Sequence, residues 1–308
     1  MIILECLVNK KKIKTENKSL IKYQNSIILS NFVVFKLLKG MKYNNEFKVI
    51  DTQEKAYLLG QIYGDGYNGC KENNKNYRFS MASINTDRDL YEKLNNLFPF
   101  LKLHFYKSHD NMVYLQNYEK AFCLDLKSLG MVSNKTDKDV TGEFHFPNIK
   151  EDLIPHFLRG YFDADGSAWY PNRVRSRNNL HIEFGCSTKN FLLSVKRYLD
   201  SKGIYFTYLE RNKKAGNGKF YTSYTLLSSN SDTSLMFANL IYKDAIIYLP
   251  YKYEKCYKHK DLKSTAFEIY GKCPYCGGSH IIRVGVRANK RRLLCKECFK
   301  RFTRPLPN

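Results

Sequence analysis

Residues 161–167 read YFDADGS, and this stretch decides how the chain is interpreted. A helix can end at Gly166, in which case Asp163 and Asp165 lie in its last turn. Unsatisfied carbonyl groups make a helix C-terminus negative, and acids there typically cost about 0.3–1 kcal/mol. The two carboxylates are unfavourable for the helix alone, which indicates a functional reason for their position.

The same pattern occurs 100 residues earlier in the chain. Residues 54–67, EKAYLLGQIYGDGY, align with residues 155–168, PHFLRGYFDADGSA, so that Asp65 matches Asp165. Each motif is followed by a polar loop, a strand-like stretch, an amphipathic helix, a hairpin and a closing helix. The sequence therefore predicts two similar α+β units, each built as helix–hairpin–helix–hairpin–helix. The expected elements are strands at 76–83 and 180–187, helices at 86–98 and 188–200, hairpins at 101–116 and 204–227, and closing helices near 117–130 and 232–247.

Local signals set the expected ends of the two motif helices. Asp51 and Glu54 have the spacing of a capping box at the start of the first helix. Pro155 means that the second helix begins near residues 153–155. Gly66 and Gly166 are expected to end the helices in the left-handed backbone conformation.

Small residues recur four apart in both motif helices: Gly60 and Gly64, then Gly160 and Ala164. Helices that carry such pairs can approach backbone to backbone. We therefore expect the two helices to pack side by side and parallel between the two units.

Parallel packing would bring Asp65 and Asp165 close together at two negative helix ends, which requires a compensating cation. Mg²⁺ takes carboxylate oxygen together with substrate phosphate, and two-metal sites stabilise the attacking and leaving oxygens in phosphodiester cleavage. The alternative is that each Asp-Gly pair only makes a turn after a helix. Two copies at matching positions favour the metal site.

LLGQIYGDG (58–66) and LRGYFDADG (158–166) resemble the two signature motifs of single-chain LAGLIDADG homing endonucleases. The first copy departs from the signature, with Gln61, Tyr63 and Gly64 where Leu, Asp and Ala would stand. The resemblance covers roughly residues 45–258 and implies two pseudo-symmetric αββαββα-like units with antiparallel DNA-binding sheets. It also implies site-specific cleavage of double-stranded DNA.

The resemblance further implies Mg²⁺ held by Asp65 and Asp165, with Gly64 and Ala164 beside them in the metal site. Asp163 has no acidic counterpart in the first motif, so we interpret it as a supporting or structural residue.

Family active sites also place a basic residue near each metal. Lys135 in SNKT and Lys252 in PYKYEK are the matching candidates, with Lys255 as the alternative to Lys252. A cation there can orient the attacking water or stabilise phosphate charge. The alternative for each lysine is an ordinary solvated surface residue.

The formal net charge of +22 indicates a polyanionic partner, although an AT-rich coding sequence would also enrich lysine. A two-stranded ribbon fits the major groove of B-DNA, so the hairpins are expected to contact DNA. Many of their basic residues would bind phosphate rather than base edges. The candidate DNA-binding residues are Arg78, Lys107, Arg173, Arg175, Arg177, Arg211, Lys213, Lys214 and Lys219 in the hairpins, and Arg287, Arg291 and Arg292 in the C-terminal tail.

The tail contains two Cys-x-x-Cys pairs separated by 18 residues, which is a pattern typical of zinc sites. The predicted ligands are Cys273, Cys276, Cys295 and Cys298. The intervening residues predict a hairpin that turns near Asn289. His280 is a spare candidate ligand but is expected at the surface. Residues 271–308 hold ten Lys or Arg and one acid, so we interpret the segment as a structural zinc ribbon that clamps DNA. A protein–protein contact is the alternative.

The chain thus divides into a basic accessory segment (1–45), a first unit (46–147), a second unit (148–262) and a zinc ribbon (268–308). Two units in one chain predict a monomer with internal pseudo-two-fold symmetry. No membrane segment or secretory signal is expected, and scattered cysteines indicate a reducing intracellular compartment.

Two other functions are compatible with these patterns. One is a non-cleaving nucleic-acid-binding protein of the same fold, such as an intron RNA maturase or a regulator. The other is an intein, but the chain begins with Met and lacks the expected splicing segments. Because both motif acids are present, the sequence favours a metal-dependent endonuclease.

Overall fold

The computed structural model describes residues 42–70, 77–106, 111–171, 179–214, 216, 218, 220–257 and 264–307. Several predicted positions lie outside these residues. They are most of the accessory segment (1–41) and the candidate DNA-binding residues Lys107, Arg173, Arg175, Arg177 and Lys219.

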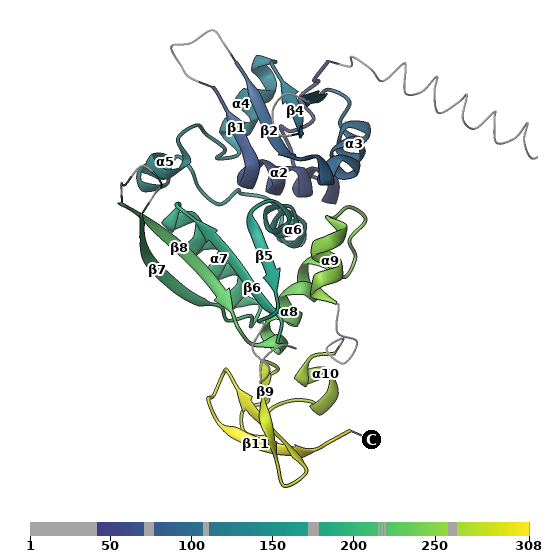
Figure 1. Cartoon of the computed structure of the whole chain (residues 1–308), viewed down its shortest axis with the longest axis vertical. Helices are drawn as coiled ribbons and strands as arrows, with labels where there is room; N and C mark the ends of the chain where they lie inside the picture. The colour runs from purple at the N-terminus through teal and green to yellow at the C-terminus, as the bar shows by residue number, and fades with distance from the viewer. Residues whose placement is uncertain are drawn as a thin grey trace, which may run out of the picture.

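The first unit is a four-stranded antiparallel sheet covered by helices on one side (Figure 1). Its strands have the order β1-β2-β4-β3. The elements are α2 (Gln53–Asp65), β1 (Gly66–Asn68), β2 (Phe79–Ile84), the 3₁₀ helix η1 (Asn85–Asp87), α3 (Arg88–Leu97), β3 (Lys102–Tyr106), β4 (Met112–Asn117), α4 (Lys120–Ser128) and α5 (Lys135–Thr141).

The second unit repeats this arrangement, with the strand order β5-β6-β8-β7. The equivalent order of strands and helices confirms the predicted duplication and the α+β fold class. The elements are the 3₁₀ helix η2 (Glu151–Leu153), α6 (Ile154–Asp165), β5 (Gly166–Trp169), β6 (His181–Cys186), α7 (Lys189–Ser201), β7 (Thr207–Lys214), β8 (Phe220–Ser228), α8 (Ser231–Tyr242) and α9 (Pro250–Cys256).

Apolar residues at helical spacing attach α3 and α7 to their sheets. Leu90, Tyr91 and Leu94 of α3 are buried, as are Phe191 and Val195 of α7. The buried residues of both units form one continuous cluster. None of the helices in the part of the chain that is described is long and apolar enough to cross a membrane.

The ends of the motif helices differ from the sequence prediction. Thr52, not Asp51, is the N-cap of α2, and its hydroxyl accepts a hydrogen bond from the backbone of Lys55. Asp51 instead forms an ion pair with the Lys55 side chain at 2.8 Å. The predicted Asp51–Glu54 capping box is therefore wrong.

The left-handed conformation predicted for Gly66 and Gly166 is also wrong, because their φ angles are −80° and −79°. At each glycine the chain leaves the helix and directly enters a strand, β1 or β5, whereas the sequence predicted a polar loop there. Glycine is required for a different reason, since an added Cβ would lie 2.4 Å from the Ile62 carbonyl oxygen or 2.0 Å from the Phe162 ring.

The C-terminal segment forms a small separate lobe below the second unit (Figure 1). It contains α10 (Ala266–Tyr270) and a three-stranded antiparallel sheet of β9 (Ile281–Arg287), β10 (Lys290–Cys295) and β11 (Arg301–Pro305). Ala288 and Asn289 adopt positive φ angles in the turn between β9 and β10, as predicted.

The ribbon lobe is held against α8 by a buried ion pair. The Asp232 carboxylate accepts hydrogen bonds from the Arg283 guanidinium, the Arg283 backbone and the Ala266 backbone. The Asp232 side chain is only 1% exposed, so this contact is shielded from solvent. The lobe is therefore fixed to the second unit rather than tethered by a linker alone.

Candidate active site

The site is built on the contact between α2 and α6, which cross the centre of the molecule side by side (Figure 1). An added Cβ at Gly60 would lie 2.0 Å from the Phe157 carbonyl oxygen, and one at Gly160 would lie 2.0 Å from the Tyr57 carbonyl oxygen. The two helices therefore touch backbone to backbone, as predicted from the small residues.

The C-terminal ends of the two helices meet at Gly64 and Ala164. The Cβ position of Gly64 is 2.4 Å from the Ala164 methyl carbon and 3.4 Å from the Asp165 carboxyl carbon. Asp65 and Asp165 thus lie at the same end of the helix pair, in the parallel arrangement that the sequence predicts.

Both carboxylates reach solvent, yet protein surrounds much of each one. Burial first, and then the charge of Asp165, raises the pKa of Asp65 to about 6. Burial also raises the pKa of Asp165, whereas Lys135 and Lys252 act in the opposite direction. Burial therefore disfavours the charged form of both acids, and a bound cation would favour that form.

Lys135 and Lys252 occupy corresponding positions in the two halves. The Lys135 ammonium donates hydrogen bonds to the carbonyl oxygens of Tyr63 and Gly64 at 2.7 and 2.8 Å. The Lys252 ammonium donates to the carbonyl oxygens of Phe162, Asp163 and Ala164. Each lysine therefore neutralises the C-terminus of one motif helix, where the helix dipole is negative.

These lysines are not ordinary surface residues. Lys252 is only 6% exposed, whereas Lys255 is exposed. The charge of Lys252 acts on both Asp65 and Asp165, so Lys252 is the lysine near the two acids. Burial lowers the pKa of Lys135 to about 8, although Asp165 and Asp65 act to raise it. Burial likewise lowers the pKa of Lys252. Their catalytic role stays a prediction.

Asp163 and Tyr63 have equivalent places in the two motifs but different side chains. Tyr63 ties the end of α2 to its own unit, whereas Asp163 ties α6 both to its own unit and to Tyr57 of α2. The Asp163 carboxylate accepts hydrogen bonds from Tyr57, Tyr242 and the backbone of Leu249. The Tyr63 hydroxyl donates to the carbonyl oxygens of Leu129 and His145. Asp163 is therefore a structural residue, in agreement with its interpretation from the sequence.

The residues present fit a hard divalent cation. Two carboxylates meet at one end of the helix pair, and oxygen is the ligand that Mg²⁺ prefers. The carbonyl oxygens of Gly64 and Ala164 already accept from lysine, but each has a second lone pair. That Gly64 and Ala164 take part in metal binding stays a prediction.

Sequence reasoning missed a cavity of about 280 Å³ beside Asp65. Its lining includes Asp65, Ser83, Asp87, Tyr91 and Tyr251. Gly66 pairs with Met81 in the antiparallel β1–β2 ladder. The pairing places β2 beside Asp65, and Asp87 follows three residues after the end of β2. A predicted pairing of β1 with β2 would have revealed this neighbourhood.

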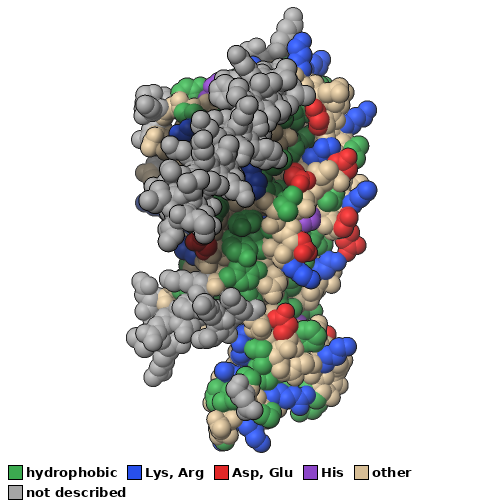
Figure 2. Space-filling model, turned by 90° about the vertical axis from the view of Figure 1, so that its right-hand side faces the viewer, with side chains coloured by type: hydrophobic (Ala, Val, Ile, Leu, Met, Phe, Trp, Pro, Cys, Tyr) green, Lys and Arg blue, Asp and Glu red, His purple; other side chains and the backbone are tan. Residues whose placement is uncertain are grey.

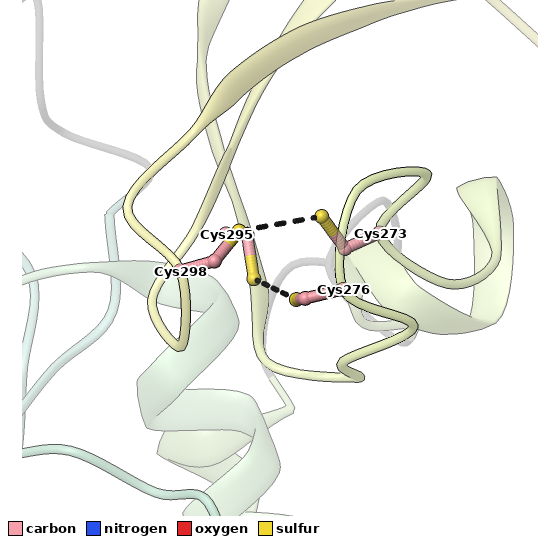
Figure 3. A group of neighbouring side chains, drawn as sticks. All are labelled: Cys273, Cys276, Cys295 and Cys298. Atoms are coloured by element: carbon pink, nitrogen blue, oxygen red, sulfur yellow. Dashed lines mark hydrogen bonds between the residues drawn. The ribbon is translucent and has the colours of Figure 1, made fainter.

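A second candidate site is the cysteine cluster of the ribbon. The sulfur atoms of Cys273, Cys276, Cys295 and Cys298 all lie within 4.8 Å of one another and point toward a common centre (Figure 3). Two of the sulfur–sulfur distances are 3.7 and 3.6 Å. Zinc–sulfur bonds of about 2.3 Å in a tetrahedron separate the sulfurs by about 3.8 Å. These two distances match a tetrahedral zinc site, and the four sulfurs are close enough together to be the ligands of one zinc ion.

His280 is not at the surface, contrary to the sequence prediction. It is completely buried, stacks on Tyr205 with ring centroids 4.9 Å apart, and lies 3.1 Å from the Thr233 hydroxyl. Burial lowers the pKa of His280 to about 4. The imidazole is therefore a neutral packing residue between the ribbon and the second unit.

The described candidate DNA-binding residues lie in the first unit, the second unit and the ribbon. Arg78 precedes β2, and Arg211, Lys213 and Lys214 lie exposed at the end of β7. On the ribbon, Arg287 is exposed, while Arg291 and Arg292 are half-buried on β10. Figure 2 shows Lys and Arg side chains over the ribbon lobe at the bottom of the view. DNA binding by each of these residues stays a prediction.

Comparison with known protein families identifies the second unit. Residues 152–242 match the family model described as a LAGLIDADG-like domain. The second unit is a LAGLIDADG-like domain. The first unit has the same strand order, so the LAGLIDADG fold occurs twice in the chain.

Solved structures similar to this chain include LAGLIDADG proteins with DNA. The homing endonuclease I-WcaI bound to its DNA recognition sequence is 19% identical, with a TM-score of 0.44, over 70% of this chain and 95% of that chain. The LAGLIDADG meganuclease I-AabMI bound to uncleaved DNA is 18% identical, with a TM-score of 0.41, over 68% and 87%.

A curated relative is the isomerizing glutamine–fructose-6-phosphate aminotransferase of Methanocaldococcus jannaschii. It is 25% identical over 209 residues, which make up 66% of this chain. The chain spans only 17% of the length of that relative.

Proposed function

We propose that the protein is a site-specific double-stranded DNA endonuclease that hydrolyses phosphodiester bonds with Mg²⁺ held by Asp65 and Asp165. The observation that carries this proposal is the meeting of the two motif acids at one end of the α2–α6 pair. Two strands of a duplex present two scissile phosphates, and a pseudo-two-fold site offers one acid to each.

The residues of the chain have separable roles in this mechanism. Asp65 and Asp165 bind the metal, and Lys135 and Lys252 keep positive charge beside the helix ends. A bound Mg²⁺ would supply Lewis acidity and stabilise the oxygens that attack and leave. The lysine ammonium groups would orient water or stabilise the charge that develops on the phosphate.

The sheets supply the DNA-binding surface in this proposal. The net charge of +22 favours a polyanion, and Arg211 and Lys213 share one face of β7 because side chains alternate along a strand. Contacts of this kind to phosphate would give affinity that weakens with salt. The ribbon would add a further basic surface at one end of the molecule.

The proposal includes a monomer in a reducing intracellular compartment. One chain contains both halves of the pseudo-dyad, so a second copy is not needed to complete the site. Cys123, Cys186 and Cys256 form no disulfide, which suits a reducing environment.

The decisive experiment incubates the purified protein with a randomised duplex library and Mg²⁺, and then sequences the ends of cut molecules. Cutting by the wild type that is lost in both Asp65→Asn and Asp165→Asn, with DNA binding retained, supports the proposal. Binding by the wild type without any cutting would overturn it in favour of a nucleic-acid-binding protein of the same fold.

A further inference from the structure

Besides Asp65, the carboxylates of Asp87 and Asp163 line the cavity. Asp163 already accepts three hydrogen bonds, so Asp87 is the acid that remains available. Asp87 is 9% exposed and lies between β2 and α3. Its carboxylate accepts hydrogen bonds from the hydroxyls of Ser83 at 2.6 Å and Thr86 at 3.5 Å. A carboxylate offers about four lone-pair sites, so two hydroxyl donors leave it able to bind a cation.

The side chain of Asp87 is not used to cap the helix that follows. It occupies the N-cap position of α3 but makes no side-chain cap hydrogen bond. Among the described residues, neither Asp65 nor Asp87 has an ion-pair partner. The residues that line the cavity include no Lys or Arg, although Lys252 and Lys135 lie near enough for their charges to act on Asp65. A cation inside the cavity would therefore be the nearest counter-ion for both carboxylates.

A separate observation points to a ligand in the same cavity. Tyr91 is 1% exposed and lines the cavity, and its hydroxyl has no hydrogen-bond partner in the described structure. Buried tyrosine hydroxyls usually find a partner. The negative charges of Asp65 and Asp87 both act on this phenol, which shows that it lies near both carboxylates.

The cavity is large enough for a hydrated ion. Its volume of about 280 Å³ far exceeds the roughly 10–15 Å³ of accessible space that a single water needs. Mg²⁺ binds carboxylate oxygen while keeping several of its waters. The Tyr91 hydroxyl is then a natural partner for one of these waters.

The second half does not reproduce this arrangement. The pairs Gly66–Met81 and Gly166–Phe184 align residues 83–87 of the first half with residues 186–190 of the second. Residues 186–190 read CSTKN and contain no acid. Cys186 takes the place of Ser83, and its thiol donates to the Thr188 carbonyl oxygen. The two halves therefore differ in chemistry although they share a fold.

We propose that Asp65, Asp87 and the Tyr91 hydroxyl form a hydrated divalent-cation site that is particular to the first half of the molecule. The first half then fills with metal at a lower concentration than the second. A consequence rests on the proposed endonuclease function. At limiting Mg²⁺ the half that binds metal more tightly cuts its DNA strand first, so the two strands are cut in a fixed order.

Terbium(III) tests the site without DNA, because it prefers oxygen ligands and its luminescence is sensitised by nearby tyrosine. Titration of the wild-type protein should give a tyrosine-sensitised signal. Asp87→Asn should weaken terbium binding by at least about tenfold, as the loss of supporting metal contacts does. Asp89→Asn is the matched control, since it removes an exposed acid two residues away, outside the cavity lining, and it should bind as the wild type does.

Tyr91→Phe provides an independent readout and should lower the sensitised emission at saturation, because it removes one of the two tyrosine rings that line the cavity. Circular dichroism checks whether each variant is folded. If Asp87→Asn does not fold, the emission of Tyr91→Phe decides whether the cation site exists. Unchanged affinity in Asp87→Asn, or unchanged emission in Tyr91→Phe, would overturn the site. Terbium binding that depends on Asp87 in a protein that cuts no DNA would retain the site and reject the endonuclease.

Discussion

The Cβ position of Gly64 lies 2.4 Å from the Ala164 methyl carbon, so the junction of the motif helices has room for one methyl group and not for two. This relationship explains why the first motif has glycine where the family signature has alanine. The departure in the first copy is a packing complement to the second copy, and it brings the two helix ends together.

We predict that Gly64→Ala destabilises the protein by about 1–3 kcal/mol, as overpacking of a close contact typically does. The double variant Gly64→Ala with Ala164→Gly keeps a single methyl group at the junction and should recover most of this loss. Gly185→Ala is the control, because its Cβ would meet nothing within 4 Å. Urea unfolding measures all three, and a double variant no more stable than Gly64→Ala would contradict the explanation.

The charge of Asp65 should make stability depend on pH in the absence of metal. Its pKa rises from 3.8 in the unfolded chain to about 6 in the fold, so the folded state binds the proton more tightly. This contribution is complete below about pH 4 and is lost as the pH rises through about 6. Asp65→Asn should therefore be more stable than the wild type at pH 8, by about 1 kcal/mol after solvent screening.

Thermal unfolding at pH 5 and pH 8 in a chelating buffer checks this expectation, with Asp89→Asn as the surface control. Added Mg²⁺ should stabilise the wild type at pH 8 more than it stabilises Asp65→Asn. A wild-type protein that gains stability between pH 5 and pH 8 relative to Asp65→Asn would show that the sign is wrong.

The fold could be predicted from the sequence because its decisive signals are local and occur twice. Gly60 and Gly160 predict a backbone contact from residue size alone, and the structure places each against a carbonyl oxygen of the other helix. The Cys-x-x-Cys pairs similarly predict the cluster without knowledge of the fold. Repetition made these signals stronger than any single motif.

What the sequence did not show depends on long-range contacts. Asp87 becomes relevant only when β2 pairs with β1 beside Asp65, and His280 becomes buried only when the ribbon packs on α8. The conformation predicted for Gly66 was wrong because this residue already belongs to strand β1, which sets its φ angle in place of a helix-ending turn. Such features follow from tertiary structure and carry little sequence signal of their own.

The ribbon should hold one zinc ion and depend on it for structure. Cys276→Ser removes an exposed ligand and should abolish zinc binding measured by mass spectrometry of the metal content. The buried cluster of the ribbon is separate from the core of the two units, so the units should stay folded. Limited proteolysis should then remove the C-terminal segment only, whereas retained zinc or a collapse of the whole fold would contradict this.

The ribbon should also add to DNA affinity through phosphate contacts. Arg287→Gln on the exposed end of β9 should weaken binding and reduce the dependence of log K on log salt by about 0.9, the value for one lost phosphate contact. Glu268→Gln in α10 is the control, since it removes a charge from the capping box without removing a cation. An unchanged salt slope in Arg287→Gln would favour a protein-binding role for the ribbon.

Lys252 and Lys255 are three residues apart, and only Lys252 should matter for cleavage. Its ammonium group contacts the end of α6, so Lys252→Met should reduce the rate of cutting by about 10²–10³, as the loss of a preorganised charge typically does. Lys255 is exposed, and Lys255→Met should cut DNA at a rate within about twofold of the wild type. Surface substitutions usually change free energies by no more than about 0.5 kcal/mol. Equal losses in both variants would indicate a general effect of charge on DNA binding.

Lys135 should set the alkaline limit of the cleavage rate. Burial lowers its pKa to about 8, and bound metal cations would lower it further, so the ammonium form is lost as the pH rises to and above 8. The arginine of Lys135→Arg keeps its charge at every accessible pH. The pH at which the cleavage rate falls should therefore be higher in this variant, even if its maximal rate is lower. Single-turnover rates from pH 6 to 10 on a cleaved duplex measure the limb, with DNA binding followed in parallel. An alkaline limb at the same pH in both proteins would mean that another group controls it.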